Sequence, residues 1–256
     1  MAAHRLLRLA LHAARLGGAE IARRTGGPVE VTYKASTDPV TSADRAGEAA
    51  IVGLIRRERP ADGILAEEGT WRASTSGLRW VVDALDGTVN FLYGVAHTAV
   101  SVACEARTRD GWTAVVGVVH DPARNETYTA VRGQGSRLDR TPIAVNDPVV
   151  LSAALIATEF SYDARMRARQ GSTMCRVLPR IRDIRSTGSS ALDLCWTAAG
   201  RFDGYFESEL SRWDWSAGAL IVTEAGGKVT PLGTGVLAAG QALHPRLRVL
   251  LRPDRG

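Results

Sequence analysis

The segment that decides the fold and the chemistry of this chain is Trp80-Val81-Val82-Asp83-Ala84-Leu85-Asp86-Gly87-Thr88-Val89-Asn90-Phe91. Its first three residues are apolar and predict a buried strand, which leads directly into two carboxylates three residues apart, Asp83 and Asp86. Gly87 and Thr88 then open what we expect to be a short helical turn. Carboxylates suit a hard cation, and free N–H groups at a helix start suit a phosphate. The segment therefore indicates a metal site beside a phosphate site, which is the layout of a metal-dependent phosphatase.

Three other segments place acids at the ends of apolar runs or at helix starts. Ile64-Leu65-Ala66-Glu67-Glu68-Gly69 ends in two acids, and Asp38-Pro39-Val40-Thr41-Ser42-Ala43-Asp44 ends at a predicted helix start. Trp213-Asp214-Trp215-Ser216-Ala217-Gly218 opens an apolar helix that leads to Thr223-Glu224-Ala225-Gly226-Gly227. Together the four segments resemble the inositol monophosphatase family, which has a Glu-Glu pair, an Asp-Pro-x-Asp-Gly-Thr-x-Asn-Phe run and a Trp-Asp-x-x-x-Gly…Glu-Ala-Gly-Gly run in this order. The resemblance spans nearly the whole chain.

The composition is that of an ordinary soluble globular protein. The 256 residues are 45% hydrophobic and 23% charged, and they can bury one large core or two closely packed halves. A net charge of +5 and a pI of about 9.5 come from scattered arginines, without a run of five basic residues. Such an excess indicates solvated helix faces, and it could draw anionic substrates to the surface. No aromatic residues interleave with the basic ones, so we expect no nucleic-acid partner.

The cysteines and the N-terminal segment bear on the cellular location. Cys104, Cys175 and Cys195 are odd in number, far apart and outside any Cys-x-x-Cys pattern, which predicts reduced, buried thiols in a cytoplasmic protein. Arginines interrupt the N-terminal segment too often for a signal peptide, and a mitochondrial presequence is the alternative to the folded amphipathic helix that we expect. No stretch reaches the roughly 20 apolar residues of a membrane span, so we expect no membrane partner. The buried face of the N-terminal helix would consist of Leu6, Ala10, Ala13, Gly17 and Ile21.

The predicted elements divide the chain into two halves. Residues 1–145 form an α+β half with an antiparallel-leaning sheet and the metal loop, and residues 146–256 form an α/β half of alternating strands and helices. No Pro/Ser/Gly-rich linker separates them, so we expect one compact unit. The family resemblance implies a layered αβαβα sandwich. Helices are predicted at 4–24, 42–59, 163–180, 189–199, 214–225 and 244–251, and strands at 63–66, 79–83, 97–106, 112–119, 126–132, 155–158, 184–186, 203–207, 227–231 and 237–239.

The candidate ligands offer only oxygen donors, because no histidine completes a zinc pattern. An all-carboxylate site favours Mg²⁺, with Mn²⁺ as a substitute. The resemblance makes the roles concrete and implies two or three ions. One would take Glu67, Asp83 and the backbone carbonyl of Leu85, and the other would take Asp83 as a bridge with Asp86 and Asp214. A third, more weakly held ion would also face Glu67.

The resemblance further implies a catalytic mechanism and a set of substrate contacts. A metal-bound water would be the nucleophile, and Thr88, hydrogen-bonded to Asp44, would orient and deprotonate it with help from Glu67. The N–H groups of Gly87 and Thr88 would hold phosphate oxygens, beside Asp86. The polyol hydroxyls would lie against Gly188 and Ser189, at the start of another helix, and Glu207. The family also suggests a homodimer.

Two departures from the family pattern lie close to the metal loop. Ala84 stands where the family usually has Pro, and Gly94-Val95-Ala96 replaces a more typical Gly-x-Pro. A proline restricts the unfolded chain by roughly 0.4–1 kcal/mol. Neither change removes a charge, so we expect a looser metal loop that keeps its ligands.

Several alternatives stay open at this point. Each acid has a plainer role as a helix cap or a solvated residue. A haloacid-dehalogenase-type phosphatase would need Asp-x-Asp-x-Thr, but the two acids of this chain, Asp83 and Asp86, are three residues apart. The sequence contains no P-loop, which an ATP-binding site of that type would need, and no Gly-x-Ser-x-Gly elbow, which is typical of serine hydrolases. We expect hydrolysis of myo-inositol 1-phosphate or a similar sugar or polyol phosphate. Histidinol phosphate, fructose 1,6-bisphosphate and 3′-phosphoadenosine nucleotides are the alternative substrates, and a phosphatase-like protein that acts as a non-catalytic binding partner is the alternative function.

Overall fold

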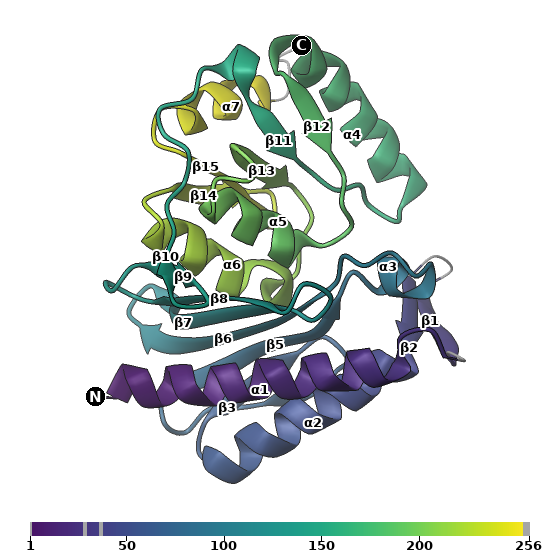
Figure 1. The fold of residues 1–256 in the computed structure, drawn as a ribbon, viewed down its shortest axis with the longest axis vertical. Helices are drawn as coiled ribbons and strands as arrows, with labels where there is room; N and C mark the ends of the chain where they lie inside the picture. The colour runs from purple at the N-terminus through teal and green to yellow at the C-terminus, as the bar shows by residue number, and fades with distance from the viewer. Residues whose placement is uncertain (1, 28–29, 36–37, 253–256) are drawn as a thin grey trace.

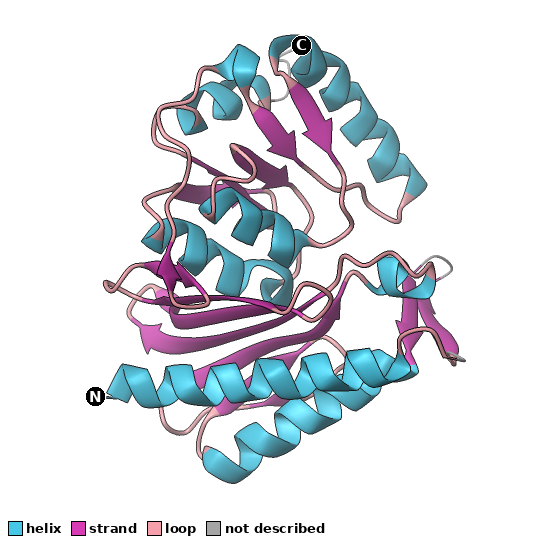
Figure 2. Cartoon of the chain, in the orientation of Figure 1, coloured by secondary structure: helices cyan, strands magenta, loops and turns pink. Residues whose placement is uncertain are grey.

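The structure is a computed structural model that describes residues 2–27, 30–35 and 38–252. Its elements stack in five layers in the order helix, sheet, helix, sheet, helix, as Figures 1 and 2 show. This confirms the αβαβα sandwich. The outer layer at one side holds α1 (Ala2–Arg24) and α2 (Ser42–Glu58), the central layer α5 (Ser190–Ala198) and α6 (Arg212–Glu224), and the other outer layer α4 (Ala164–Val177) and α7 (His244–Leu250).

The larger sheet is almost entirely antiparallel, with the strand order β10-β9-β8-β7-β6-β5-β3-β4. The exception is the parallel pair β3–β5, in which Ala66 lies opposite Val82. Both strands therefore end at the same edge of the sheet, where the candidate site begins. The strands are β3 (Gly63–Ala66), β4 (Trp71–Arg72), β5 (Leu78–Asp86), β6 (Ala99–Thr108), β7 (Gly111–Asp121), β8 (Glu126–Val131), β9 (Ser136–Leu138) and β10 (Thr141–Pro142).

The smaller sheet has five strands in the order β12-β11-β13-β15-β14. The strand β11 (Leu155–Ala157) runs parallel to both β12 (Asp183–Arg185) and β13 (Gly204–Glu207). The strands β14 (Lys228–Leu232) and β15 (Gly235–Ala239) continue the sheet in antiparallel fashion. Because the three parallel strands end on one side, the residues after β11 and at the end of β13 lie near each other and near the start of α5.

The helix α1 packs on the larger sheet through the face that the sequence predicts. Gly17 allows a close approach, since a Cβ at this position would lie 2.7 Å from Cδ1 of Ile51 on α2. These small and apolar side chains join α1, α2 and the sheet into one core. The other buried residues of the face are Leu6, Ala10, Ala13 and Ile21.

Several elements differ from the sequence prediction, which did not contain the short strands β4, β9 and β10. A hairpin of β1 (Val31–Ala35) and β2 (Asp38–Thr41) precedes α2, and no pattern indicated it, because strands this short show no clear alternation. The helix expected over 163–180 is α-helical only to Val177 and continues as a 3₁₀ turn. The reason is Pro179, which has no N–H to donate to the preceding turn.

The predicted burial of the cysteines holds for two of the three. Cys104 and Cys195 are buried, but Cys175 is exposed, and the prediction of a buried thiol was wrong there. The difference follows from helix geometry, because Met174 and Val177 face the core from α4 and Cys175 lies between them on the outer side. Within the part of the chain that the structure describes, no helix has both the length and the apolar character needed to cross a membrane.

Candidate active site

Acidic side chains from separate elements meet in one open cleft of about 480 Å³. The four predicted metal-ligating acids all line it, and they come from the end of β3, from β5 and from α6. Asp44 and Ser189 lie behind its wall rather than in it. The predicted site residues that line the cleft are Glu67, Asp83, Leu85, Asp86, Gly87, Thr88, Gly188, Glu207 and Asp214.

The geometry of the larger sheet brings three of these acids together. Ala66 pairs with Val82 on the parallel strand β5, so Glu67 and Asp83, the next residue of each strand, lie side by side. Asp86 is three positions further along, and in a regular strand it would face the opposite side of the sheet. A bulge between Asp83 and Asp86 inserts one extra residue into β5 and returns Asp86 to the side of Asp83.

Asp86 is held by the start of α5, on the other side of the cleft. Its Oδ2 accepts hydrogen bonds from Oγ of Ser189 at 2.5 Å and from the backbone N–H of Ala191 at 2.8 Å. Ser189 is fully buried, and its Oγ also caps α5 by accepting from the N–H of Leu192. We expected Ser189 to contact substrate, but the structure directs its hydroxyl to Asp86. Its neighbour Ser190 lines the cleft instead.

Asp214 is both a helix-capping residue and a lining residue of the cleft, the two roles between which the sequence did not decide. It is the third residue of α6, and its Oδ2 accepts the backbone N–H of Ser211 at 2.7 Å in a capping box. That cap uses one carboxylate oxygen, and the residue nevertheless lines the cleft. The helix start thus fixes the side chain at the site.

Burial raises the pKa of all four acids. The pKa of Asp83 and that of Asp214 lie well above the usual range, because burial and then the neighbouring carboxylates disfavour their charged forms. Burial raises the pKa of Asp86 to about 7. Burial also raises the pKa of Glu67, although the Lys34 ammonium opposes the shift. Positive charge close to these four acids would stabilise their ionised forms.

Lys34 on β1 supplies one such charge, and the sequence analysis did not assign it to the site. Its Nζ donates to Oε1 of Glu67 at 3.0 Å and to Oε1 of Glu68 at 2.7 Å. Burial alone would lower the pKa of the ammonium, but the two carboxylates outweigh it and raise the pKa. The only feature of the sequence that could have drawn attention to Lys34 is that it is one of just two lysines in the chain.

Thr88 and Asp44 form the hydrogen bond that the family resemblance implied. Thr88 Oγ1 lies 2.9 Å from Oδ1 of Asp44 and 3.1 Å from the carbonyl oxygen of Leu85, so its single hydroxyl proton has these two acceptors within reach. Thr88 starts the short helix α3 (Thr88–Leu92), whose N-cap is Gly87 at φ 93°. A Cβ at Gly87 would lie 3.0 Å from the carbonyl oxygen of Gly188, so only glycine fits this approach of the two halves.

Glu207, at the end of β13, also lines the cleft. Its Oε2 accepts hydrogen bonds from the hydroxyl of Tyr205 at 2.6 Å and from Oγ of Ser190 at 3.2 Å. Burial outweighs these bonds and raises the pKa of Glu207 to about 8. The carboxyl group is therefore protonated over part of the neutral range and can both donate to and accept from a hydroxyl.

The donors of the cleft fit a hard divalent cation in their chemistry. They are carboxylate and carbonyl oxygens, and neither His nor Cys is among the described residues that line the cleft. Residues 2–27, 30–35 and 38–252 contain no group of three or more His, Cys, Asp or Glu already gathered as a metal-binding set. Single oxygens of Glu67, Asp86 and Asp214 are engaged elsewhere, by Lys34, by α5 and by the α6 cap. Binding would therefore require these side chains to turn towards the ion.

The fold and the oxygen-lined cleft together define a phosphatase-like protein. A sequence model of the inositol monophosphatase family matches residues 3–251, and the chain belongs to this family. Its motifs had implied this membership, which is now confirmed.

Some of the similar proteins are named SuhB, and others are named inositol monophosphatase. The Nus factor SuhB of Haemophilus influenzae is 39% identical over 251 residues, which cover 96% of this chain and 92% of that protein. The solved structure of the extragenic suppressor protein suhB from Bartonella henselae has a TM-score of 0.92 and 32% identity, covering 98% of this chain and 99% of that one. The inositol monophosphatase of Anabaena (Nostoc) sp. PCC 7120 has a TM-score of 0.86 and 33% identity, covering 98% and 96%.

Proposed function

We propose that this protein is a Mg²⁺-dependent phosphomonoesterase that hydrolyses myo-inositol 1-phosphate or a similar polyol or sugar phosphate. The observation that carries the proposal is the convergence of Glu67, Asp83, Asp86 and Asp214 in one cleft, with the pKa of each raised. Asp83 is buried and the other three acids are half-buried, and carboxylates gathered in this way destabilise a fold, so stability gives no reason to gather them. Binding of divalent cations does give a reason to gather these four acids in one cleft.

The ligand set follows the family resemblance. Glu67, Asp83 and the carbonyl oxygen of Leu85 would hold one ion, Asp83, Asp86 and Asp214 a second, and Glu67 would face a third. Bound Mg²⁺, or Mn²⁺ in its place, would lower the pKa of a water molecule and neutralise charge on the phosphate.

The other residues of the cleft would position water and substrate. Thr88 orients the attacking water, and Asp44 receives its proton through the Thr88 hydroxyl, which already donates to it. The N–H groups of Gly87 and Thr88 face the phosphate oxygens. Gly188 and Glu207, which both line the cleft, contact the hydroxyls of the leaving alcohol, as the family resemblance implies.

The test is release of inorganic phosphate by the purified protein. We expect release from myo-inositol 1-phosphate with Mg²⁺ or Mn²⁺ and none in EDTA, and Asp83→Asn serves as the matched inactive control. Activity that survives EDTA would contradict the metal assignment. Histidinol phosphate, fructose 1,6-bisphosphate and a 3′-phosphoadenosine nucleotide, assayed in parallel, decide the substrate class.

We infer a second candidate function, binding of RNA in transcription, from the relatives named Nus factor and from one surface of this chain. Residues 164–187 carry many exposed arginines and a single acid, Asp183. Such a surface attracts nucleic-acid phosphates with an affinity that falls as salt rises. This favours a partner that the scattered charge alone did not predict. The exposed arginines are Arg165, Arg167, Arg169, Arg180, Arg182 and Arg185.

Anisotropy of a labelled single-stranded RNA, titrated at several salt concentrations, tests this second function. The variant with Arg165, Arg169 and Arg180 all changed to Glu should bind at least about tenfold more weakly at low salt. Its phosphate release should be unchanged, because none of the three residues lines the cleft. Equal binding by the variant and the unaltered protein would reject the proposal.

A further inference from the structure

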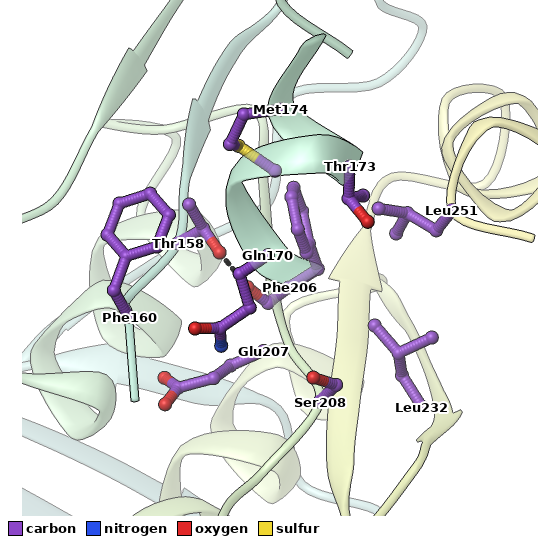
Figure 3. Close-up of a pocket in the computed structure, with 10 residues that line it drawn as sticks. All are labelled: Thr158, Phe160, Gln170, Thr173, Met174, Phe206, Glu207, Ser208, Leu232 and Leu251. Atoms are coloured by element: carbon purple, nitrogen blue, oxygen red, sulfur yellow. Dashed lines mark hydrogen bonds between the residues drawn. The ribbon is translucent and has the colours of Figure 1, made fainter. Parts of the chain in front are cut away.

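A second, smaller cavity of about 80 Å³ lies beneath α4, at the ends of the parallel strands β11 and β13 (Figure 3). Figure 3 shows side chains from α4, β13 and β14 surrounding it on several sides. Its position is set by the layered fold, because α4 covers the carboxyl ends of these strands without filling the space above them. The residues that line it include Phe160, Gln170, Met174, Phe206, Glu207 and Leu232.

The cavity adjoins the end of the cleft at which the leaving alcohol would lie. Phe160 and Glu207 line both the cavity and the cleft. None of the four candidate metal ligands lines the cavity. A group that enters it is therefore attached to the alcohol part of a substrate and not to its phosphate.

The chemistry of the walls selects an apolar group. Thr158 and Gln170, two of the polar side chains there, already have partners inside the protein. Thr158 Oγ1 donates to the carbonyl oxygen of Phe206 at 2.6 Å, and Oε1 of Gln170 accepts from the N–H of Ser161 at 2.9 Å. Phe160, at the boundary between cavity and cleft, is 38% exposed and offers an apolar face to an incoming group. Beyond Glu207, which lines both the cavity and the cleft, a hydroxyl or a charge would lie among Met174, Phe206 and Leu232 and would be penalised unless it found a partner.

We propose that the cavity is a substrate subsite for a small apolar substituent on the alcohol. The preferred substrate class is then a polyol or sugar phosphate that carries a short alkyl ether or similar group, and not a bare cyclitol phosphate. The volume gives room for roughly three to five heavy atoms beyond the ring. The inference rests on the proposed phosphomonoesterase function and specifies its substrate.

A series of substrates tests the subsite. The probes are the O-methyl, O-ethyl, O-propyl and O-butyl ethers of myo-inositol 1-phosphate, prepared at each ring position and assayed for phosphate release with Mg²⁺. At one ring position we expect kcat/KM to rise by about fourfold for each added methylene, as burial of a CH₂ group predicts, until the cavity is full. Calorimetric titration with the corresponding phosphate-free ethers gives a readout that does not depend on turnover, and affinity should rise in the same order.

Two variants change the size of the cavity without touching the catalytic residues. Thr173→Leu fills it from α4, and we expect it to abolish the advantage of the propyl ether while leaving kcat/KM for inositol 1-phosphate within about twofold. Met174→Ala enlarges it and should move the optimum to a longer chain. Ser172→Leu adds the same side chain on the exposed side of α4 and is the matched control, which should behave as the unaltered protein.

The possible outcomes separate the inference from the proposed function. Release of phosphate from inositol 1-phosphate with no gain from any ether at any position overturns the subsite and leaves the phosphomonoesterase standing. A gain that survives Thr173→Leu also overturns it, because the substituent would then lie elsewhere. Absence of phosphate release from every compound overturns the proposed function and the subsite with it.

Discussion

Thr88 Oγ1 donates a hydrogen bond to Oδ1 of Asp44 at 2.9 Å, between residues 44 positions apart in the chain. Oδ2 of Asp44 is occupied separately, since it accepts from the backbone N–H of Thr41 at 2.7 Å and from the Thr41 hydroxyl. The same carboxylate therefore closes the capping box at the start of α2 and orients a hydroxyl in the cleft. Asp44 can reach Thr88 only because the cap holds it in place.

We expect Thr88→Ala to lower turnover by at least about 100-fold, the usual range for loss of proton-transfer assistance. The carboxylate ligands stay intact, so Mn²⁺ affinity measured by calorimetry should stay within about twofold. Thr88→Ser retains the hydroxyl and is the matched control, which should keep most of the activity. A Thr88→Ala protein that is as active as Thr88→Ser would remove Thr88 and Asp44 from the mechanism.

Asp83→Asn and Asp214→Asn should separate stability from activity. Each change removes a carboxylate charge that burial disfavours, so the metal-free protein should unfold at a higher temperature. Turnover should fall by at least about 100-fold because a cation loses an anionic ligand. Asp183→Asn, at an exposed ion pair, is the control and should change neither. Thermal melts and phosphate release measure the two effects, and near-normal turnover in either variant would show that the wrong acids are assigned.

The stability of the metal-free protein should fall as the pH rises from about 5.5 to about 8.5. Burial raises the pKa of Asp86 to about 7 and that of Glu207 to about 8, above the values of unfolded carboxyl groups. The folded protein binds more protons than the unfolded chain between about pH 4 and these pKa values, so the stabilisation is fully present only below about pH 4 and is lost as the pH rises through them. We expect the melting temperature to drop by at least about 3 °C, the shift that ~1 kcal/mol gives in a chain of this size.

The check on this pH effect is a pair of substitutions. Asp86→Asn combined with Glu207→Gln should reduce the pH dependence of the melting temperature, because these two side chains no longer titrate while Asp83 and Asp214 still do. Mg²⁺ should stabilise the unaltered protein more at the alkaline end, where ionised Asp86 attracts the cation. A melting temperature that rises with pH in the metal-free protein would contradict the assigned direction.

Much of the fold could be predicted because local patterns carry it. The face of α1 follows from helical spacing alone, and the start of α2 follows from the capping residue types Thr41 and Ser42, of which the structure uses Thr41. The convergence of the acids in one cleft followed from motifs whose residue types already indicate oxygen ligands. The bulge that turns Asp86 to the side of Asp83 was not predictable, because it appears only in the pairing of β5 with β6.

The parts of the site that escaped prediction depend on contacts between distant elements. The family resemblance implied a substrate contact for Ser189, but the structure buries its hydroxyl against Asp86. Lys34 joins the site through a hairpin too short to show a strand pattern. The cavity beside Glu207 depends on how α4 covers the smaller sheet, and no local pattern encodes its volume.

Removal of the Lys34 ammonium should tighten the binding of divalent cations. Its Nζ lies 3.0 Å from Oε1 of Glu67, so a cation that binds this oxygen must displace the ammonium or share the oxygen with it. We expect Lys34→Gln to lower the Kd for Mn²⁺ by about threefold to tenfold, the scale of a partly screened charge–charge interaction near a protein surface. Isothermal titration calorimetry measures the change.

The same substitution should loosen the β1–β2 hairpin, because Lys34 also joins it to Glu68 at 2.7 Å. Faster amide hydrogen exchange in the described part of the hairpin would report this. Lys228→Gln removes the other lysine of the chain, which is exposed on β14, and is the matched control for the change in net charge. If both variants tighten Mn²⁺ binding equally, the effect belongs to net charge, and the contact between Lys34 and Glu67 does not compete with the cation.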